Sequence, residues 1–259
     1  MKIYVLTDIE GVAMVSRFDQ TGREGDGPGK HLAMRLLTGE VNAAVDGILS
    51  VDPMAEVVVW DGHGSGGIDV MEFHPRAKLI TRGPIRAPYY LDSSFDALFV
   101  VGQHARAGTP DANLCHTYSS RTIEYYKLNG VLMGEFGCRA ALAGELGVPT
   151  VFISGDDKAV DEARELIPGI FGAAVKQGLG LELALHLSPP RARELIRETA
   201  AEACRNVKSV PPLRLQPPYQ LEVRRMVGVE APRTLPPGAR ELDSRTVLYT
   251  AEHTWDLPI

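Results

Sequence analysis

The chain opens with an apolar strand that ends in two acidic residues. Residues 3–7 form a short apolar run, and Asp8 and Glu10 follow it directly. Because alternate side chains of a strand point the same way, both carboxylates are expected to face one side at the strand's carboxyl end. Open α/β sheets place their ligand sites at that edge. Two carboxylates on one face repel each other, so the segment predicts a site for a bound cation.

Strand-like and helix-like segments alternate through the first two-thirds of the sequence. The expected strands are 3–7, 56–60, 97–101, 150–154 and 172–176, and the expected helices are 30–50, 134–146 and 156–166. A hairpin is expected over 123–133, with its turn at Asn129 and Gly130. Residues 22–29 are expected to form a glycine- and charge-rich loop. Alternation of this kind is typical of a mainly parallel sheet covered by helices. We therefore expect an α/β fold.

The last 70 residues follow a different pattern. Residues 191–206 read as an amphipathic helix, three proline pairs follow it, and 221–229 and 246–251 are strand candidates. This part is expected to form a smaller, strand-rich α+β portion. The predicted division is a metal-binding catalytic domain over 1–187 and a smaller domain over 188–259.

Charge and hydropathy exclude several classes of protein. The 259 residues carry a formal net charge of −6 and show no cluster of Lys and Arg, which argues against nucleic-acid binding. No apolar stretch approaches the roughly 20 residues that span a bilayer, and the first residues begin a strand, not a secretion signal. The three cysteines form no CxxC pair and are expected to be reduced. We expect a cytoplasmic protein with no membrane partner.

A histidine or an acid flanked by glycine follows each buried segment. His63 comes after the strand at 56–60, His104 comes after the strand at 97–101, and Glu135 comes after the hairpin. Together with Asp8 and Glu10 they are expected at one edge of the sheet. Mixed imidazole and carboxylate ligands suit zinc or a similar divalent ion. Five ligands exceed the need of one tetrahedral zinc ion, so we expect two ions, with Asp8 as the best candidate for a shared, bridging ligand.

Each of these residues also has a purely structural explanation. Asp8 and Glu10 could cap a helix or pair with a basic side chain, and either histidine could be a hydrogen-bonded loop residue. Glu135 could simply favour the dipole of the helix that it begins. The metal hypothesis gains its strength from the five positions taken together.

Two further residues are candidates for chemistry. His116 follows a flexible loop after His104, where a free imidazole could transfer a proton, although a strand-start histidine is an equally good interpretation. A catalytic pair with Cys115 is not expected, since adjacent strand residues point to opposite faces. Lys176 could contact an oxyanion or a substrate carboxylate, or be a surface lysine.

At this point the sequence resembles the zinc-dependent D-aminopeptidases of the dipeptide-transport operon type, peptidase family M55. The likeness rests on the segment around His116 and on residues 8–11, 61–63, 104–107, 134–137, 155–157 and 173–177. It runs from residue 1 to about 185 and is looser beyond that point.

The resemblance implies two zinc ions per chain. Asp8 would bridge them, Glu10 and His63 would complete one site, and His104 and Glu135 would complete the other. His116 matches the histidine treated as catalytic in that family. The family cleaves short peptides with an N-terminal D-residue, such as D-Ala-D-Ala, and assembles as a ring-shaped homodecamer.

The sequence leaves two alternatives to this function. An aminopeptidase for small L-residues, or an amidase for cell-wall fragments, would use the same metals, because the chirality of a pocket is not legible from sequence. A non-catalytic peptide-binding protein is a weaker alternative, since a binder has no need of five converging metal ligands.

Overall fold

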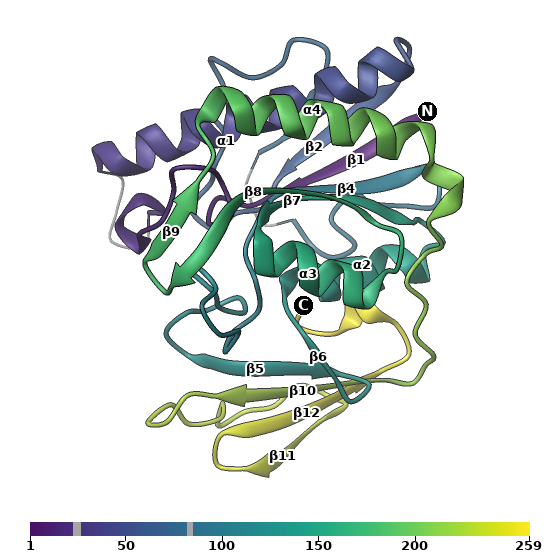
Figure 1. The fold of residues 1–259 in the computed structure, drawn as a ribbon. Helices are drawn as coiled ribbons and strands as arrows, with labels where there is room; N and C mark the ends of the chain where they lie inside the picture. The colour runs from purple at the N-terminus through teal and green to yellow at the C-terminus, as the bar shows by residue number, and fades with distance from the viewer. Residues whose placement is uncertain (23–26, 82–84) are drawn as a thin grey trace.

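A seven-stranded sheet forms the centre of the computed structural model, which describes residues 1–22, 27–81 and 85–259 (Figure 1). In spatial order its strands are β3 (Lys78–Ile80), β2 (Glu56–Asp61), β1 (Lys2–Thr7), β4 (Ala97–Gln103), β7 (Thr150–Asp156), β8 (Phe171–Gly180) and β9 (Leu183–His186). All neighbours are parallel except β8 and β9. The expected α/β fold with a mainly parallel sheet is confirmed.

Helices cover both faces of this sheet. Helix α1 (Pro28–Val51) and helix α4 (Pro189–Arg205) pack on each other along one face, and α2 (Glu135–Glu145) and α3 (Asp157–Leu166) lie on the other face (Figure 1). Gly47 lets α1 and α4 approach closely, since a Cβ atom there would come within 2.4 Å of the backbone oxygen of Arg197. The β1, β2, β4 and β7 strands are therefore buried between two helical layers.

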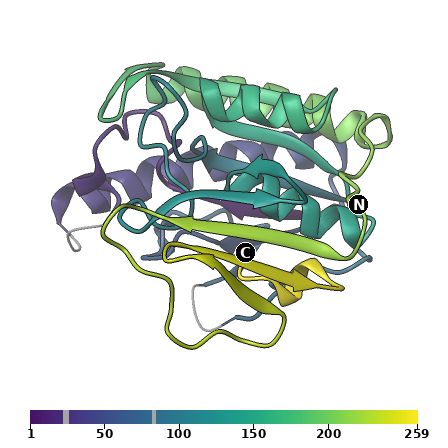
Figure 2. The same ribbon diagram turned by 90° about the horizontal axis from the view of Figure 1, so that it is seen from below.

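A second, five-stranded antiparallel sheet lies below α2 and α3 (Figures 1 and 2). Its order is β11 (Ala239–Asp243), β12 (Thr246–Ala251), β10 (Tyr219–Arg225), β5 (Ile123–Leu128) and β6 (Val131–Met133). The tight turn between β5 and β6 is the predicted hairpin, with Asn129 and Gly130 both at positive φ. The strand-rich nature of the C-terminal part is confirmed.

Several elements differ from the sequence-based expectation. Strand β8 is longer than 172–176, β10 ends at Arg225, and β3, β9 and β11 were not expected. These three are short strands with partly or fully exposed side chains, so they lack the long buried apolar run that marks the central strands. Short 3-10 helices occur at Phe18–Gln20, Val207–Ser209 and Thr254–Asp256. Of the expected loop at 22–29, residues 23–26 lie outside the described part, and 28–29 already belong to α1.

The division of the chain between the two sheets does not fall at residue 187. Helix α4 packs against α1 and β8 and so belongs with the larger sheet, while β5 and β6 belong with the C-terminal strands. The β5–β6 hairpin and the C-terminal strands are far apart in the sequence but in direct contact, since the backbone N–H of Asn129 donates to the carbonyl of Gln220 at 2.8 Å. The division into domains 1–187 and 188–259 stays a prediction.

Candidate metal centre

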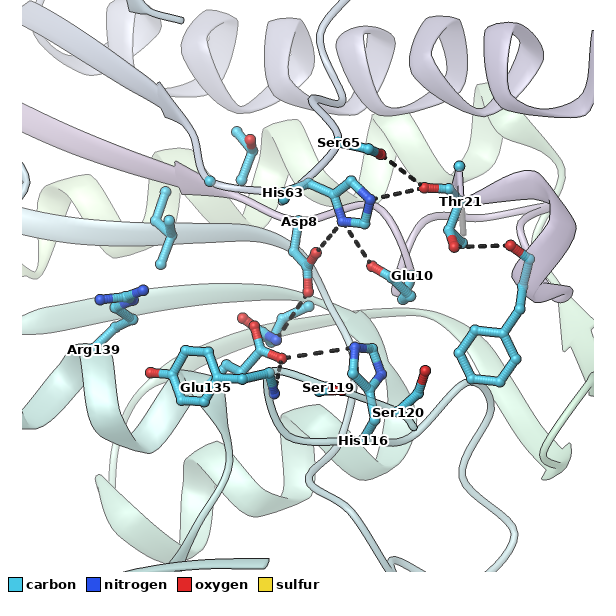
Figure 3. A pocket seen from close by; sticks show the side chains of 18 of the residues that line it. Asp8, Glu10, Thr21, His63, Ser65, His116, Ser119, Ser120, Glu135 and Arg139 are labelled. Carbon is cyan, nitrogen blue, oxygen red and sulfur yellow. Dashed lines mark hydrogen bonds and ion pairs between the residues drawn. The ribbon is translucent and has the colours of Figure 1, made fainter. Parts of the chain in front are cut away.

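A pocket of about 320 Å³ opens at the carboxyl ends of β1, β2 and β4 (Figure 3). Residues at the ends of these three strands, in the loops that follow them and on α2 line it, and the acids and histidines among them are Asp8, Glu10, His63, His116 and Glu135. His104 lies behind His116, with the two rings stacked at 3.9 Å between centroids. The structure thus gathers all six predicted metal and catalytic residues at one edge of the sheet.

Two glycines bring the loop after β1 against the end of β4. A Cβ atom on Gly102 would lie 2.1 Å from the backbone oxygen of Asp8, and one on Gly11 would lie 2.1 Å from that of Gln103. The backbone N–H of Asp8 donates to Val101 at 2.8 Å, and that of Gly11 donates to Gly102 at 2.7 Å. Because the backbones approach so closely, Asp8 comes within reach of His104.

Asp8 lies between two imidazoles. Its Oδ1 is 3.2 Å from Nδ1 of His63, and its Oδ2 is 3.3 Å from Nε2 of His104. Glu10 faces only the first imidazole, with 3.2 Å between its Oε2 and Nδ1 of His63. Glu135 faces the second, with 3.4 Å between its Oε1 and Nε2 of His104. Two clusters therefore meet at Asp8.

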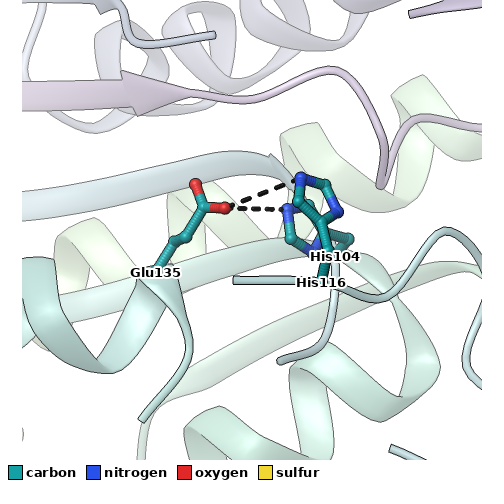
Figure 4. A group of neighbouring side chains, drawn as sticks. All are labelled: His104, His116 and Glu135. Carbon is teal, nitrogen blue, oxygen red and sulfur yellow. Dashed lines mark ion pairs between the residues drawn. The ribbon is translucent and has the colours of Figure 1, made fainter. Parts of the chain in front are cut away.

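A backbone carbonyl fixes the tautomer of each histidine. Because a carbonyl only accepts, Nε2 of His63 carries the proton donated to Thr21 at 2.8 Å. In the same way Nδ1 of His104 donates to Ala105 and Nδ1 of His116 donates to Leu114, each at 2.8 Å. The remaining nitrogen of each ring points at a carboxylate, as Figure 3 shows for His63 and Figure 4 for His104 and His116. This is how metal-binding histidines are held by their surroundings.

Burial and mutual contact shift the pKa values of these groups. Burial raises the pKa of Asp8 to about 7, and the Glu10 charge adds to the rise. Burial also opposes charge on Glu10 and Glu135, but the facing imidazoles outweigh it, so that the Glu10 pKa is well below its usual value and the Glu135 pKa is about 2. The same carboxylates outweigh burial at His63 and His104, whose pKa values rise, the latter to about 10. The three carboxylates of the centre therefore stabilise a positive charge placed between them.

Two buried polar atoms test whether a cation fits. Glu10 Oε2 and His104 Nε2 are both shielded from solvent and make no hydrogen bond among the described residues. Two triplets have ligand atoms within 4.8 Å of one another, Asp8 with Glu10 and His63, and His104 with His116 and Glu135. Buried carboxylate oxygens and imidazole nitrogens that converge without a well-formed hydrogen bond are the donor set of zinc and similar ions. The residues present fit divalent metal ions.

His116 differs from the other two histidines. Its Nε2 is 3.8 Å from Oε1 of Glu135, a longer distance than that of His104. Burial, together with the neighbouring His104, lowers the pKa of His116. Its imidazole is therefore neutral at pH 7, with the lone pair of Nε2 turned to the pocket. A neutral imidazole in this position can accept a proton.

Lys176 does not reach the pocket, contrary to the expected substrate contact. Its ammonium is buried and donates to the backbone oxygens of Glu10 and Val15 and to Oδ1 of Asn113. All three of its protons are used. The lysine therefore fixes the loop that carries Glu10, and it is buried, so it is not the surface lysine of the alternative interpretation either.

Replacing Lys176 by Met is expected to lower the free energy of unfolding by about 3 kcal/mol or more. The change would leave three buried acceptors without a donor, at about 1–3 kcal/mol each. Urea unfolding of the metal-free protein would measure it. Lys78→Met, at an exposed ion pair with Glu56, is the matched control and should cost less than about 1 kcal/mol. Equal effects of both changes would contradict the assigned role.

Sequence reasoning missed three polar residues at this site. Gln103 donates from its side-chain amide to Oδ2 of Asp8 at 3.2 Å. The backbone N–H of Tyr118 donates to Oε1 of Glu135 at 2.7 Å. Arg139 lines the pocket one helical turn after Glu135. Only Arg139 left a readable signal, because residues four apart on a helix share a face.

The fold and the site together define an α/β protein with a carboxylate and imidazole cluster suited to divalent metals. A family model described as Peptidase_M55, D-aminopeptidase, matches residues 1–258. The chain is 33% identical to the D-aminopeptidase of Bacillus subtilis (strain 168) over 218 residues, which cover 82% of this chain and 77% of that protein. The chain therefore belongs to the M55 D-aminopeptidase family and is a peptidase.

A solved structure shares the fold. It is described as the Zn-dependent D-aminopeptidase DppA from Bacillus subtilis, a self-compartmentalizing protease, and it superposes with a TM-score of 0.88 at 28% identity. The match covers 98% of this chain and 93% of that chain. It extends through the C-terminal part, where the sequence likeness to the family was looser. No helix among the residues described is long and apolar enough to cross a membrane.

Proposed function

We propose that the chain is an aminopeptidase that removes N-terminal D-residues from short peptides such as D-Ala-D-Ala, through a centre of two zinc ions. The observation that carries the proposal is the position of Asp8, whose two oxygens face the imidazoles of two separate clusters. Membership of the D-aminopeptidase family and the name of the zinc-dependent relative support the activity and the metal.

The proposed ligands divide into two sets. Asp8 is shared, Glu10 and His63 hold one ion, and His104 and Glu135 hold the other. Zinc, when bound, would polarise a carbonyl group and lower the pKa of coordinated water towards about 7. Gln103 and the backbone N–H of Tyr118 support the ligands by donating hydrogen bonds to the carboxylates of Asp8 and Glu135.

The chain's own residues handle the proton and the substrate. His116, whose pKa is lowered by burial and His104, would accept a proton at Nε2 and deliver it to the leaving amine. The carbonyl of Leu114 holds the opposite nitrogen and so keeps Nε2 turned towards the pocket. The free amine of the substrate would meet Glu10 or another acid of the pocket, which would make the enzyme an exopeptidase.

Metal content and hydrolysis of D-Ala-D-Ala on the same preparation test the proposal. We expect two zinc ions per chain and loss of turnover after removal by a chelator, with recovery on adding zinc back. Paired D-Ala and L-Ala p-nitroanilides separate a D-aminopeptidase from an L-aminopeptidase. Full activity of the metal-stripped protein, or preference for the L-substrate, would overturn the proposal.

We also propose that the chain assembles as a ring-shaped homodecamer in the cytoplasm. The β8–β9 hairpin supports an interface, since it exposes several leucines, among them Leu183 at 59% and Leu185 at 63%. Exposed apolar clusters of this kind are typical of subunit contacts. The name of the DppA relative, a self-compartmentalizing protease, is consistent with such an assembly.

The paired change Leu183→Asp and Leu185→Asp is expected to dissociate the assembly. Burying two new carboxylates at a contact would cost several kcal/mol per interface. Light scattering after size exclusion would show the fall in mass. Val227→Asp, at a residue 86% exposed in the loop after β10, is the control and should leave the mass unchanged. An unchanged mass of the paired variant would place the interface elsewhere.

A further inference from the structure

Arg139 lies at the end of the pocket that the proposed metal ligands do not occupy. It follows Glu135 by one turn of α2, and both side chains line the pocket (Figure 3). Its guanidinium carbon is 4.2 Å from the ring centre of Tyr89, 5.2 Å from that of Trp60 and 5.6 Å from that of Tyr118. Aromatic rings therefore hold the guanidinium in place.

No carboxylate oxygen in the described part of the chain lies within ion-pair distance of Arg139. Its guanidinium contacts the neutral hydroxyl of Tyr89 and interacts with the charge of Glu135 one turn earlier, but its Nη1 is shielded from solvent and makes no hydrogen bond to a described residue. The hydroxyl of Tyr118 is shielded as well, and the Cys138 thiol, a weak hydrogen-bonding group, is its neighbour. An unpaired polar atom in a buried place costs free energy, and aromatic contacts offset only part of it. Two such donors at one end of one pocket point to an anionic ligand.

We propose that Arg139 and the Tyr118 hydroxyl bind the free C-terminal carboxylate of the peptide substrate. The inference rests on the proposed function and names its substrate class, a short zwitterionic peptide and not a peptide amide. A guanidinium presents its N–H groups in the planar fork that matches a carboxylate. The opposite end of the pocket is acidic, so the two ends together suit a molecule with an amine at one terminus and a carboxylate at the other.

The spacing along α2 agrees with this assignment. Four residues of α-helix advance about 6 Å. A peptide carboxylate lies about 3.5 Å beyond the preceding carbonyl carbon, and a charged hydrogen bond adds about 2.8 Å. A substrate whose scissile carbonyl lies beside Glu135 therefore places the carboxylate of the next residue within reach of Arg139.

Comparison of D-Ala-D-Ala with its C-terminal amide tests the proposal on the unaltered protein. We expect kcat/KM to be on the order of 100-fold higher for the free acid, because the amide leaves the guanidinium without its anion. Arg139→Gln should collapse this ratio to near one, mainly through a rise in KM for the acid. Arg139→Lys, which keeps the charge but not the fork, should fall between the two.

Two further variants test the role of the Tyr118 hydroxyl and provide a control arginine. Tyr118→Phe removes one hydroxyl and should lower the acid-to-amide ratio several-fold. Arg121→Gln is the matched control, since Arg121 lines the same pocket but is exposed, and the ratio should persist. A ratio near one in the unaltered protein, or its loss in Arg121→Gln but not in Arg139→Gln, would overturn the proposal.

Calorimetry on the metal-stripped protein separates this proposal from the proposed function. Binding of D-Ala-D-Ala should exceed that of its amide by tenfold or more, and Arg139→Gln should remove the difference. If the acid is preferred while neither peptide is hydrolysed by the zinc-loaded enzyme, the activity is wrong and the carboxylate site stands. If both peptides are cleaved equally well and bound equally well, the carboxylate site is wrong and the activity stands.

Discussion

Replacing Asp8 by Asn is expected to empty both metal positions. The two Asp8 oxygens face different imidazoles, Oδ1 that of His63 and Oδ2 that of His104. An amide keeps only one oxygen and no charge, so it cannot bridge, and both sets are weakened by one substitution. We expect the zinc content to fall from two per chain to near zero. Hydrolysis of D-Ala-D-Ala should fall by about 10³-fold or more, because metal stabilisation of the developing charge is worth several kcal/mol.

Glu10→Gln is the matched control for this result. It makes the same chemical change two residues away, but Oε2 of Glu10 faces only His63. About one zinc ion per chain should therefore remain, held by Asp8, His104 and Glu135. Metal analysis after dialysis measures both variants, and circular dichroism checks that each is folded. Equal losses in the two variants would contradict the bridging role of Asp8.

The buried strands could be predicted from the sequence because each ends in a sharp change from apolar to polar residues. Each of β1, β2 and β4 changes from apolar to polar residues where it leaves the helical layers, and a parallel sheet brings those ends to one edge. The sequence therefore sufficed to propose that Asp8, His63 and His104 lie together. It did not show which imidazole faces which carboxylate, because that depends on backbone contacts such as Gly102 against Asp8.

The features that could not be predicted depend on contacts between residues that are far apart in the sequence. Lys176 ends an apolar run, yet its ammonium turns to the loop after β1 because Glu10, Val15 and Asn113 offer acceptors there. The sequence places Arg139 on the helix face of Glu135, but the aromatic rings that hold it come from distant segments and could not be predicted. The β5–β6 hairpin was predictable from its turn, but its pairing with β10 joins residues 93 to 102 positions apart.

His116→Ala is expected to lower turnover by about 10²- to 10⁴-fold, the usual contribution of general acid–base catalysis. Both zinc ions should remain, because the assigned ligands are untouched. Cys115→Ser is the control at the adjacent position. The Cys115 thiol contacts the carbonyl of Thr109 at 3.7 Å, and burial raises its pKa, so thiolate chemistry is not expected and activity should be retained.

The measurement that decides between roles for His116 is the metal content of the Ala variant. His116 lies in one cluster with His104 and Glu135, so the geometry alone also allows it to act as a ligand. A ligand and a proton carrier both lose turnover when removed, but only the ligand takes a metal ion with it. His116 stacks on His104 and lies farther from Glu135 than His104 does. That arrangement suits an imidazole that faces the substrate, and we therefore expect an inactive variant that still binds two zinc ions.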